Sequence, residues 1–103
     1  MKPIKIEIDG VEYTVTIPVY MTPLLSYFVE KMIFPHKSFA DAKKSCDDVQ
    51  KILNEFRKHV KPEADDMTMI VLLFKVNNEY VKRFQEAFKA GNFTAGRENP
   101  LSK

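Results

Sequence analysis

The stretch IKIEIDGVEYTVTI, residues 4–17, alternates apolar and polar residues on both sides of Asp9-Gly10. Alternation with a period of two predicts β-strands, and Asp-Gly between two such runs predicts a type I′ turn, which needs φ > 0 at both central residues. The two-residue turn also fixes which residues face each other. The facing pairs are all apolar: Ile8 with Val11, Ile6 with Tyr13, and Ile4 with Val15. We therefore predict a β-hairpin with one apolar face that another layer must cover, because an isolated hairpin is marginal in water.

The composition predicts one cytoplasmic domain. A length of 103 residues suits a single domain, and an apolar fraction of 45% suits a globular one. The single cysteine, Cys46, excludes an intrachain disulfide and favours a reducing cytosol. No signal peptide is visible, and the longest apolar run, residues 69–74, is too short to cross a bilayer. We expect a cytoplasmic protein that does not enter a membrane.

The segment after the hairpin predicts a first helix. Pro18 ends the second strand, Thr22 is a suitable N-cap, and Pro23 stands at the first helical position. The helix is expected over residues 24–34 and ends before Pro35. Its apolar stripe is wide, which predicts either near-complete burial or a surface for a partner.

A second helix is predicted to begin after Ser38, which precedes Asp41 at a spacing like that of a capping box. Apolar residues then recur in steps of three and four, which is the a/d pattern of a heptad seam. This seam consists of Phe39, Ala42, Cys46, Val49, Leu53, Phe56 and Val60. A second capping signal, Ser45 with Asp48, leaves open a division into two helices.

The segment MTMIVLLFKV, residues 67–76, fits either a buried helix or a buried strand. We favour a helix because Asp65 and Asp66 precede it, and acidic side chains stabilise a helix N-terminus. A third strand beside the hairpin is the alternative. Asn77-Asn78 predicts a turn or kink before a last amphipathic helix over residues 79–90.

Together these elements predict an α+β fold, an N-terminal β-hairpin packed on a bundle of three to four helices. Residues 1–91 form a single globular domain in this prediction, with Gly91 as the stop of the last helix. Residues 92–103, NFTAGRENPLSK, show no periodicity and are expected to form a flexible tail.

No catalytic, cofactor or metal site is indicated by the sequence. His36 and His59 lie on different predicted elements and have no further ligand at a zinc-like spacing. Cys46 lies on the apolar seam, where a free thiol usually acts as a small hydrophobic residue. Residues 63–66, EADD, fit the acidic first turn of a helix, and three glycines leave no phosphate-binding loop. We therefore expect no enzyme activity, no cofactor and no small-molecule substrate.

The lysine-rich segments make nucleic-acid binding an alternative rather than the preferred interpretation. Sixteen Lys and Arg stand against fourteen Asp and Glu, so the formal net charge is only +2. A protein that neutralises phosphates along a duplex usually carries a larger positive excess. Acidic residues also interleave with the lysines, which favours an ordinary solvated surface.

The quantity of aromatic and methionine side chains is the sequence feature that points to a function. Eight Phe, four Tyr and five Met belong either to a well-filled core or to a surface for another chain, because interface centres are enriched in these residue types. The partner is then another protein or a second copy of this chain. The candidate partner-binding residues are Leu25, Phe28, Met32, Phe39, Val49, Leu53 and Phe56.

Two segments resemble the small tail assembly chaperones of long-tailed phages. IKIEIDGVEYTV, residues 4–15, is similar to the short hairpin that opens many of these proteins. MIVLLFKVNNEYVKRFQEAFKAG, residues 69–91, is similar to the helix, polar turn and helix that close them. The resemblance implies a helical protein of the host cytoplasm that binds apolar segments of the tape-measure protein or of tail-tube subunits during virion assembly, without catalytic residues. The acidic C-terminal extension of some members has no counterpart here.

Two other classes of function remain open at this point. One is a small regulatory or nucleic-acid-associated protein that uses the lysine-rich faces. The other is an inhibitor that masks a host protein, which has the same interaction physics as a chaperone and differs only in its partner.

Overall fold

A β-hairpin over residues 4–15 is the first element of the computed structural model, which describes residues 3–89. Strand β1 (Ile4–Ile8) pairs antiparallel with β2 (Val11–Val15). Asp9 has a φ of 51° and Gly10 a φ of 83°, both positive as a type I′ turn requires. The predicted register is confirmed in each apolar pair: Ile4 with Val15, Ile6 with Tyr13, and Ile8 with Val11.

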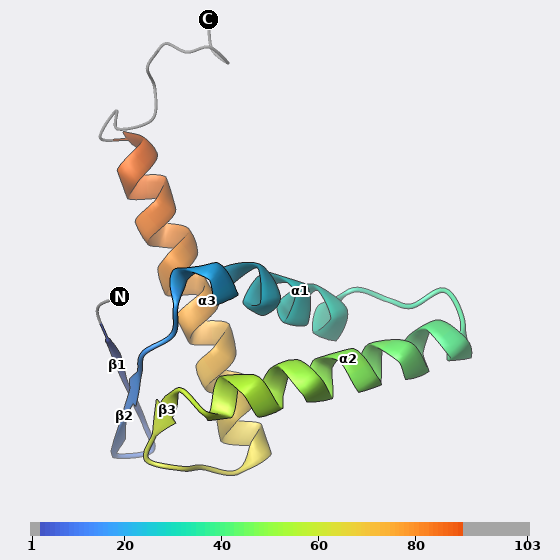
Figure 1. Cartoon of the computed structure of the whole chain (residues 1–103), viewed down its shortest axis with the longest axis horizontal. Coiled ribbons are helices and arrows are strands. Elements are labelled where there is room, and N and C mark those ends of the chain that lie inside the picture. Colours follow the sequence, from blue (N-terminus) through green and yellow to red (C-terminus); the bar gives the residue numbers. More distant parts are fainter. Residues whose placement is uncertain (1–2, 90–103) are drawn as a thin grey trace, which may run out of the picture.

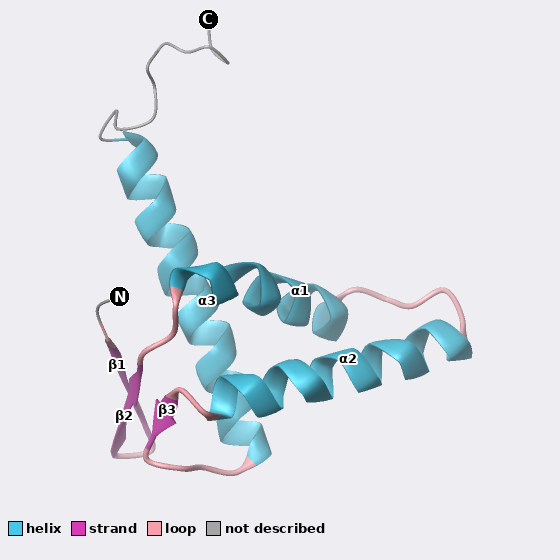
Figure 2. Cartoon of the chain, in the orientation of Figure 1, coloured by secondary structure: helices cyan, strands magenta, loops and turns pink. Residues whose placement is uncertain are grey.

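Three α-helices follow the hairpin (Figures 1 and 2), which confirms the predicted α+β fold class. They are α1 (Thr22–Ile33), α2 (Phe39–Arg57) and α3 (Asp66–Lys89), and a short 3-10 helix, η1 (Val19–Met21), leads directly into α1. Helix α2 is continuous, so the second capping signal at Ser45 does not divide it.

A third strand, β3 (Val60–Lys61), lies beside β2 and gives the sheet order β1-β2-β3. Val15 pairs with Val60, and the Thr16 N–H donates to the His59 carbonyl at 3.0 Å. The placement of Val60 on the second helix was therefore wrong. Val60 is buried at the sheet, and the alternative of a third strand within residues 67–76 was also wrong, because those residues are helical.

Arg57 links the end of α2 to the start of α3. Its guanidinium donates a hydrogen bond to the Ala64 carbonyl at 2.6 Å and forms an ion pair with Asp66. Both contacts hold the start of α3 against the end of α2. Helix α2 ends at Arg57, and the residues that connect it to α3 pass beside β2, where Val60 and Lys61 form β3.

Helix α3 is continuous over its 24 residues, which confirms the helical interpretation of residues 67–76. The predicted turn at Asn77-Asn78 was wrong. Val76 and Tyr80 are both buried on the same face on either side of the asparagines. Burial of two such side chains contributes about 3 kcal/mol or more, which exceeds the cost of about 0.7 kcal/mol for each poor helix former. The Asn77 side-chain oxygen also accepts a hydrogen bond from the Ser26 hydroxyl at 3.2 Å.

At two of the three helix N-termini, a side chain predicted from the sequence accepts a hydrogen bond from the first turn. Ser38 Oγ accepts a hydrogen bond from the Asp41 N–H at 3.1 Å, as a cap should. The Asp65 carboxylate accepts one from the Thr68 N–H at 2.9 Å, and hydrogen bonds from Thr68 lower the pKa of Asp65. Thr22 is not a cap, because η1 precedes α1 directly and the Thr22 hydroxyl donates to the Val19 carbonyl at 2.9 Å.

The core lies where α3 crosses the inner ends of α1 and α2, next to the hairpin (Figure 1). Phe28 of α1 meets Phe74 of α3 edge-to-face, with ring centroids 6.3 Å apart. The largest fully buried side chains come from β2, from all three α-helices and from the segment after β2. They are Phe28, Phe56, Ile17, Leu25, Met69, Leu72, Leu73, Val15 and Val76.

Helices α1 and α2 extend together well beyond α3 on the side away from the sheet (Figure 2). The radius of gyration is 16.2 Å, compared with about 13 Å for a compact domain of about 100 residues. The predicted helix stop at Gly91 and the predicted tail over residues 92–103 lie outside the described residues.

Candidate protein-binding surface

Residues 31–46 form what we call the distal arm: the end of α1, the connection to α2 and the start of α2. Figure 1 shows this segment on the far side of α1 and α2 from the sheet. Within the distal arm only Ser45 is buried. Helix α2 has 19 residues and is therefore about 28 Å long, whereas a helix crossing it is about 10 Å wide. Helix α3 therefore covers the inner part of α2 and leaves the distal arm uncovered.

The distal arm carries apolar side chains that point into solvent. Phe39 is 84% exposed and Phe34 is 62% exposed, and Met32 and Ile33 are exposed as well. Full burial of such a side chain contributes roughly 1.5–3 kcal/mol relative to full exposure, and each of these side chains lacks part of that contribution. Isolated apolar residues on a surface are ordinary, but four within residues 32–39 concentrate apolar surface at one end of the molecule.

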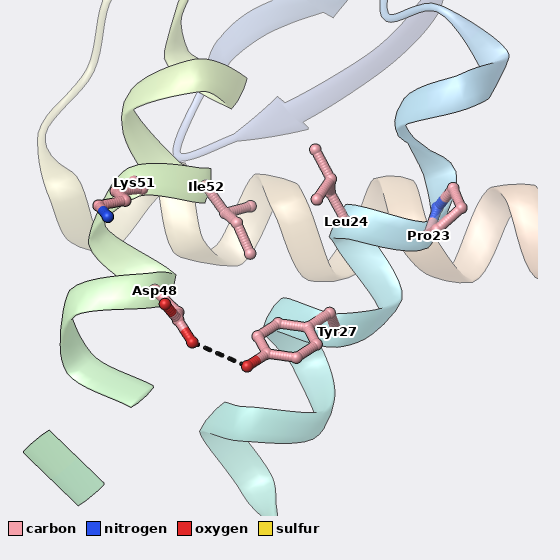
Figure 3. Close-up of a pocket in the computed structure, with 6 residues that line it drawn as sticks. All are labelled: Pro23, Leu24, Tyr27, Asp48, Lys51 and Ile52. Atoms are coloured by element: carbon pink, nitrogen blue, oxygen red, sulfur yellow. Dashed lines mark hydrogen bonds between the residues drawn. The ribbon is translucent and has the colours of Figure 1, made fainter. Parts of the chain in front are cut away.

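Polar contacts join α1 to α2 at the inner boundary of the distal arm. The Tyr27 hydroxyl donates a hydrogen bond to the Asp48 carboxylate at 2.8 Å (Figure 3), and the Lys44 ammonium lies 3.3 Å from the same carboxylate. The hydrogen bond between Tyr27 and Asp48 raises the pKa of Tyr27 and lowers the pKa of Asp48. These contacts set the position of α1 relative to α2 without burying apolar surface there.

A largely apolar cleft of about 440 Å³ opens between α1 and α2 beside this hydrogen bond. Figure 3 shows Leu24 on α1 and Ile52 on α2 on opposite sides of it. The lining residues are Pro23, Leu24, Tyr27, Asp48, Lys51 and Ile52. Its volume is large enough for a ligand group, but Asp48 is already engaged by Tyr27 and Lys44. The cleft therefore suits the binding of an apolar side chain from a partner better than it suits a catalytic reaction.

A smaller cleft of about 190 Å³ lies within the distal arm, on the part of the heptad seam that α3 does not cover. It is lined by Lys31, Met32, His36, Ala42, Ser45, Cys46 and Val49. Cys46 is exposed, so the interpretation of this thiol as a buried hydrophobic residue was wrong. The reason is its position: the seam continues past the end of the surface that covers it.

The structure divides the seven candidate partner-binding residues into two groups. Leu25, Phe28, Leu53 and Phe56 are buried in the core and are not exposed to a partner in this structure. Met32 and Phe39 are exposed on the distal arm, and Val49 is half-buried at the smaller cleft. The candidates that remain available to a partner are Met32, Phe39 and Val49.

Three residues of this surface were not among the candidates. Ile33 and Phe34 are exposed at the end of α1, and Leu24 is exposed at the larger cleft. The sequence held a signal for the first two, because they immediately precede Pro35, where a helix must end and its last side chains have few neighbours. No comparable sequence signal distinguished Leu24 from the buried Leu25 beside it.

The histidines do not form a metal centre with other side chains. His36 Nδ1 lies 3.5 Å from Ser45 Oγ, and His59 Nε2 lies 3.9 Å from the Glu55 carboxylate. Over residues 3–89, no group of three or more His, Cys, Asp or Glu side chains is close enough to hold a metal ion.

Comparisons with protein-family models, with curated proteins and with solved structures found no match for this chain. In the described part of the chain, no helix combines the length and the apolar character needed to cross a membrane. The function is therefore inferred from the surface itself.

Proposed function

We propose that this protein is a non-enzymatic interaction module whose distal arm binds an apolar segment of another protein. The observation that carries the proposal is the exposure of four large apolar side chains within residues 32–39, at one end of the molecule: Met32, Ile33, Phe34 and Phe39. Aromatic side chains and methionine are enriched at the centres of protein interfaces, and methionine adapts to partners of different shape.

The clefts support this proposal because they supply pockets beside the exposed side chains. An apolar cleft between α1 and α2 and a smaller one at Met32 and Val49 lie along the same pair of helices. A partner segment with apolar side chains at helical spacing places them into such a groove, which is a common mode of helix recognition. Lysines 31 and 51 stand at these clefts and favour acidic residues beside the apolar ones.

The resemblance of residues 4–15 and 69–91 to tail assembly chaperones suggests the class of partner. In this proposal the protein acts in the cytoplasm of a phage-infected host. It holds apolar segments of the tape-measure protein, or of tail-tube subunits, until the tail is assembled. Such a role needs an exposed apolar surface on a stable scaffold and no catalytic residues, and the distal arm provides that surface.

Binding of tail-protein peptides tests the proposal directly. Labelled 20-residue peptides that tile the tape-measure and tail-tube proteins of the same genome are titrated with the protein, and binding is measured by fluorescence anisotropy. The double variant Phe34→Ser, Phe39→Ser removes exposed aromatic rings without touching the core. We expect at least about tenfold weaker binding, because buried aromatic anchors contribute most of the affinity of such interfaces.

The matched control is the double variant Tyr20→Ser, Met67→Ser. These side chains are 78% and 69% exposed, but they lie outside the distal arm. The control should bind as the wild type does. Equal losses in both double variants, or no binding of any peptide by the wild type, would contradict the proposal.

The two other classes give different results in the same experiments. A nucleic-acid-binding protein shifts the mobility of a short DNA duplex in a gel at low salt, and its affinity for the duplex falls steeply as the salt concentration rises. An inhibitor of a host protein binds that protein through the distal arm and binds none of the tail peptides.

A further inference from the structure

Strand β1 has an unpaired edge. It is the outermost strand in the order β1-β2-β3. The residues that flank a two-residue hairpin turn exchange both backbone hydrogen bonds, so Ile4, Ile6 and Ile8 direct their N–H and C=O groups toward β2. Lys5 and Glu7 therefore direct theirs away from β2. Such an edge is a template for another strand.

The unpaired edge is accessible. A groove of about 430 Å³ runs between it and α3. Four consecutive residues, Pro3 to Ile6, line one side of the groove, so the backbone edge itself forms that wall. Lys75, Glu79 and Arg83 of α3 line the other side, and Arg83 is paired with Glu79 at 3.4 Å. Among the described residues, no second strand pairs with this edge.

The sequence of β1 is complementary to itself. IKIEI, residues 4–8, reads the same in reverse except that Lys5 and Glu7 exchange places. If two copies pair antiparallel about Ile6, Lys5 stands opposite Glu7 of the second copy, and isoleucine stands opposite isoleucine at the other positions. Lys5 and Glu7 are also the residues whose N–H and C=O groups point away from β2. In this register the outward N–H and C=O groups of one copy therefore face those of the other copy, as antiparallel pairing requires.

The same register resolves a charge conflict within the hairpin. Glu7 stands directly opposite Glu12, and like charges in facing positions are destabilising. Among residues 3–89, neither of these glutamates nor Lys5 takes part in an ion pair. In the paired arrangement, Lys5 of the second copy lies beside Glu7 on the side away from Glu12. The half-buried Ile6 and Ile8 gain apolar neighbours at the same time.

We propose that the β1 edge is a homodimer interface, in which β1 of a second copy adds antiparallel in the register centred on Ile6. The two three-stranded sheets then form one six-stranded sheet, and the two distal arms lie at its opposite ends. An acidic peptide is the competing occupant of the groove, but it would place an acid against Glu7. In the homodimer, Lys5 of each copy stands opposite Glu7 of the other copy, so each charge on the edge faces an opposite charge.

A cross-linking experiment tests the register. In a Cys46→Ser background, Ile6→Cys places the two new thiols opposite each other, at a Cα separation of about 4.5 Å that suits a disulfide. Ile8→Cys is the matched control, since Ile8 is half-buried like Ile6 but lies about 14 Å from Ile8 of the second copy in this register. Mild oxidation should convert the Ile6→Cys protein to a covalent dimer and leave the Ile8→Cys protein without a covalent cross-link. Equal cross-linking of both would overturn the register.

A charge exchange tests the interface without any new covalent bond. Lys5→Glu puts like charges opposite each other at both symmetric positions, and we expect the dimer dissociation constant from analytical ultracentrifugation to rise about tenfold. The double variant Lys5→Glu, Glu7→Lys restores the opposite pairs and should return the constant close to that of the wild type. Lys43→Glu, the same charge change at an exposed position on the distal arm, is the control and should have no effect.

Three results would overturn the proposal. One is a wild-type protein that stays monomeric up to about 0.5 mM, where mass action favours even weak dimers. The second is a dimer that Lys5→Pro leaves intact, since proline removes an outward N–H that edge pairing needs. The third is a dimer that the Phe34→Ser, Phe39→Ser variant abolishes while Lys5→Glu does not, which would place self-association on the distal arm.

Discussion

The inner and outer halves of the α1–α2 pair have similar side chains and different surroundings. Leu25, Phe28, Leu53 and Phe56 are almost completely buried, whereas Met32, Ile33 and Phe39 on the same two helices, and Phe34 just after α1, are exposed. The difference is the presence of α3, which crosses the inner half only (Figure 1). Two antiparallel helices alone do not enclose a core. A third element is needed, and where it is missing the same apolar pattern becomes a surface.

Leu53→Asp should break the inner half completely. Leu53 is 4% exposed, and a buried unpaired carboxylate costs several kcal/mol, about as much as the total stability of a small domain. We expect loss of the cooperative thermal transition measured by far-UV circular dichroism. Phe39→Asp on the same heptad seam is the control, and it should change the free energy of unfolding by no more than about 0.5 kcal/mol. A folded, monomeric Leu53→Asp protein would contradict the division into inner and outer halves.

Phe28→Ala measures how tightly the inner half is packed. Phe28 is buried on α1 and meets the edge of the Phe74 ring on α3. Removal of a buried phenyl ring typically costs about 3–5 kcal/mol, because transfer free energy is lost and a cavity remains. Urea unfolding should show a loss of this size, and Phe34→Ala on the distal arm should show almost none. Similar losses for the two substitutions would mean that the distal arm is part of the core.

Tyr80→Phe should stabilise the protein. The Tyr80 ring is buried on α3, and its hydroxyl has no hydrogen-bond partner among the described residues. Burial raises the pKa of this phenol. An unpaired buried hydroxyl costs on the order of 1 kcal/mol, so its removal should raise the free energy of unfolding by about that amount. A clear loss of stability in urea titrations would show that the hydroxyl is satisfied in solution.

Asp48→Asn should have the smallest effect, and that effect should depend on pH. Hydrogen bonds from Tyr27 and Lys44 lower the pKa of Asp48 in the folded protein, so its stabilising contribution is present above the ordinary carboxyl pKa and is lost as the pH falls through the lowered value. The melting temperature of the variant should therefore be slightly below that of the wild type at pH 7, and the difference should vanish in strong acid. Asp47→Asn is the control, because Asp47 accepts no side-chain hydrogen bond within residues 3–89. A difference that is independent of pH would rule out this origin.

Local patterns predicted the hairpin, the Ser38 cap and the three helical segments because each depends on a few neighbouring residues. The continuity of α3 and the burial limit on α2 depend on contacts between segments far apart in the sequence. Asn77 favours a turn by itself, but Val76 and Tyr80 on either side of the asparagines are both buried in the core. Similarly, the spacing of the heptad seam does not show that the part of α2 covered by other elements ends between Val49 and Cys46.

The candidate site was predicted in part for the same reason. Amphipathic spacing identifies which residues lie on the apolar face of a helix but not whether anything covers that face. Met32 and Phe39 were assigned to a partner and are exposed, whereas Leu53 and Phe56 follow the same spacing and are buried.

The extended shape of the molecule, with α1 and α2 reaching beyond α3 and the C-terminal part of α3 projecting past α1 (Figure 1), also determines how the protein behaves in a size measurement. A radius of gyration of 16.2 Å is what a compact protein of about 190 residues would have, nearly twice the 103 residues of this chain. A monomer calibrated against globular standards by elution volume would therefore be taken for a dimer. Only a method that reports mass independently of shape, such as light scattering or sedimentation equilibrium, distinguishes the two states.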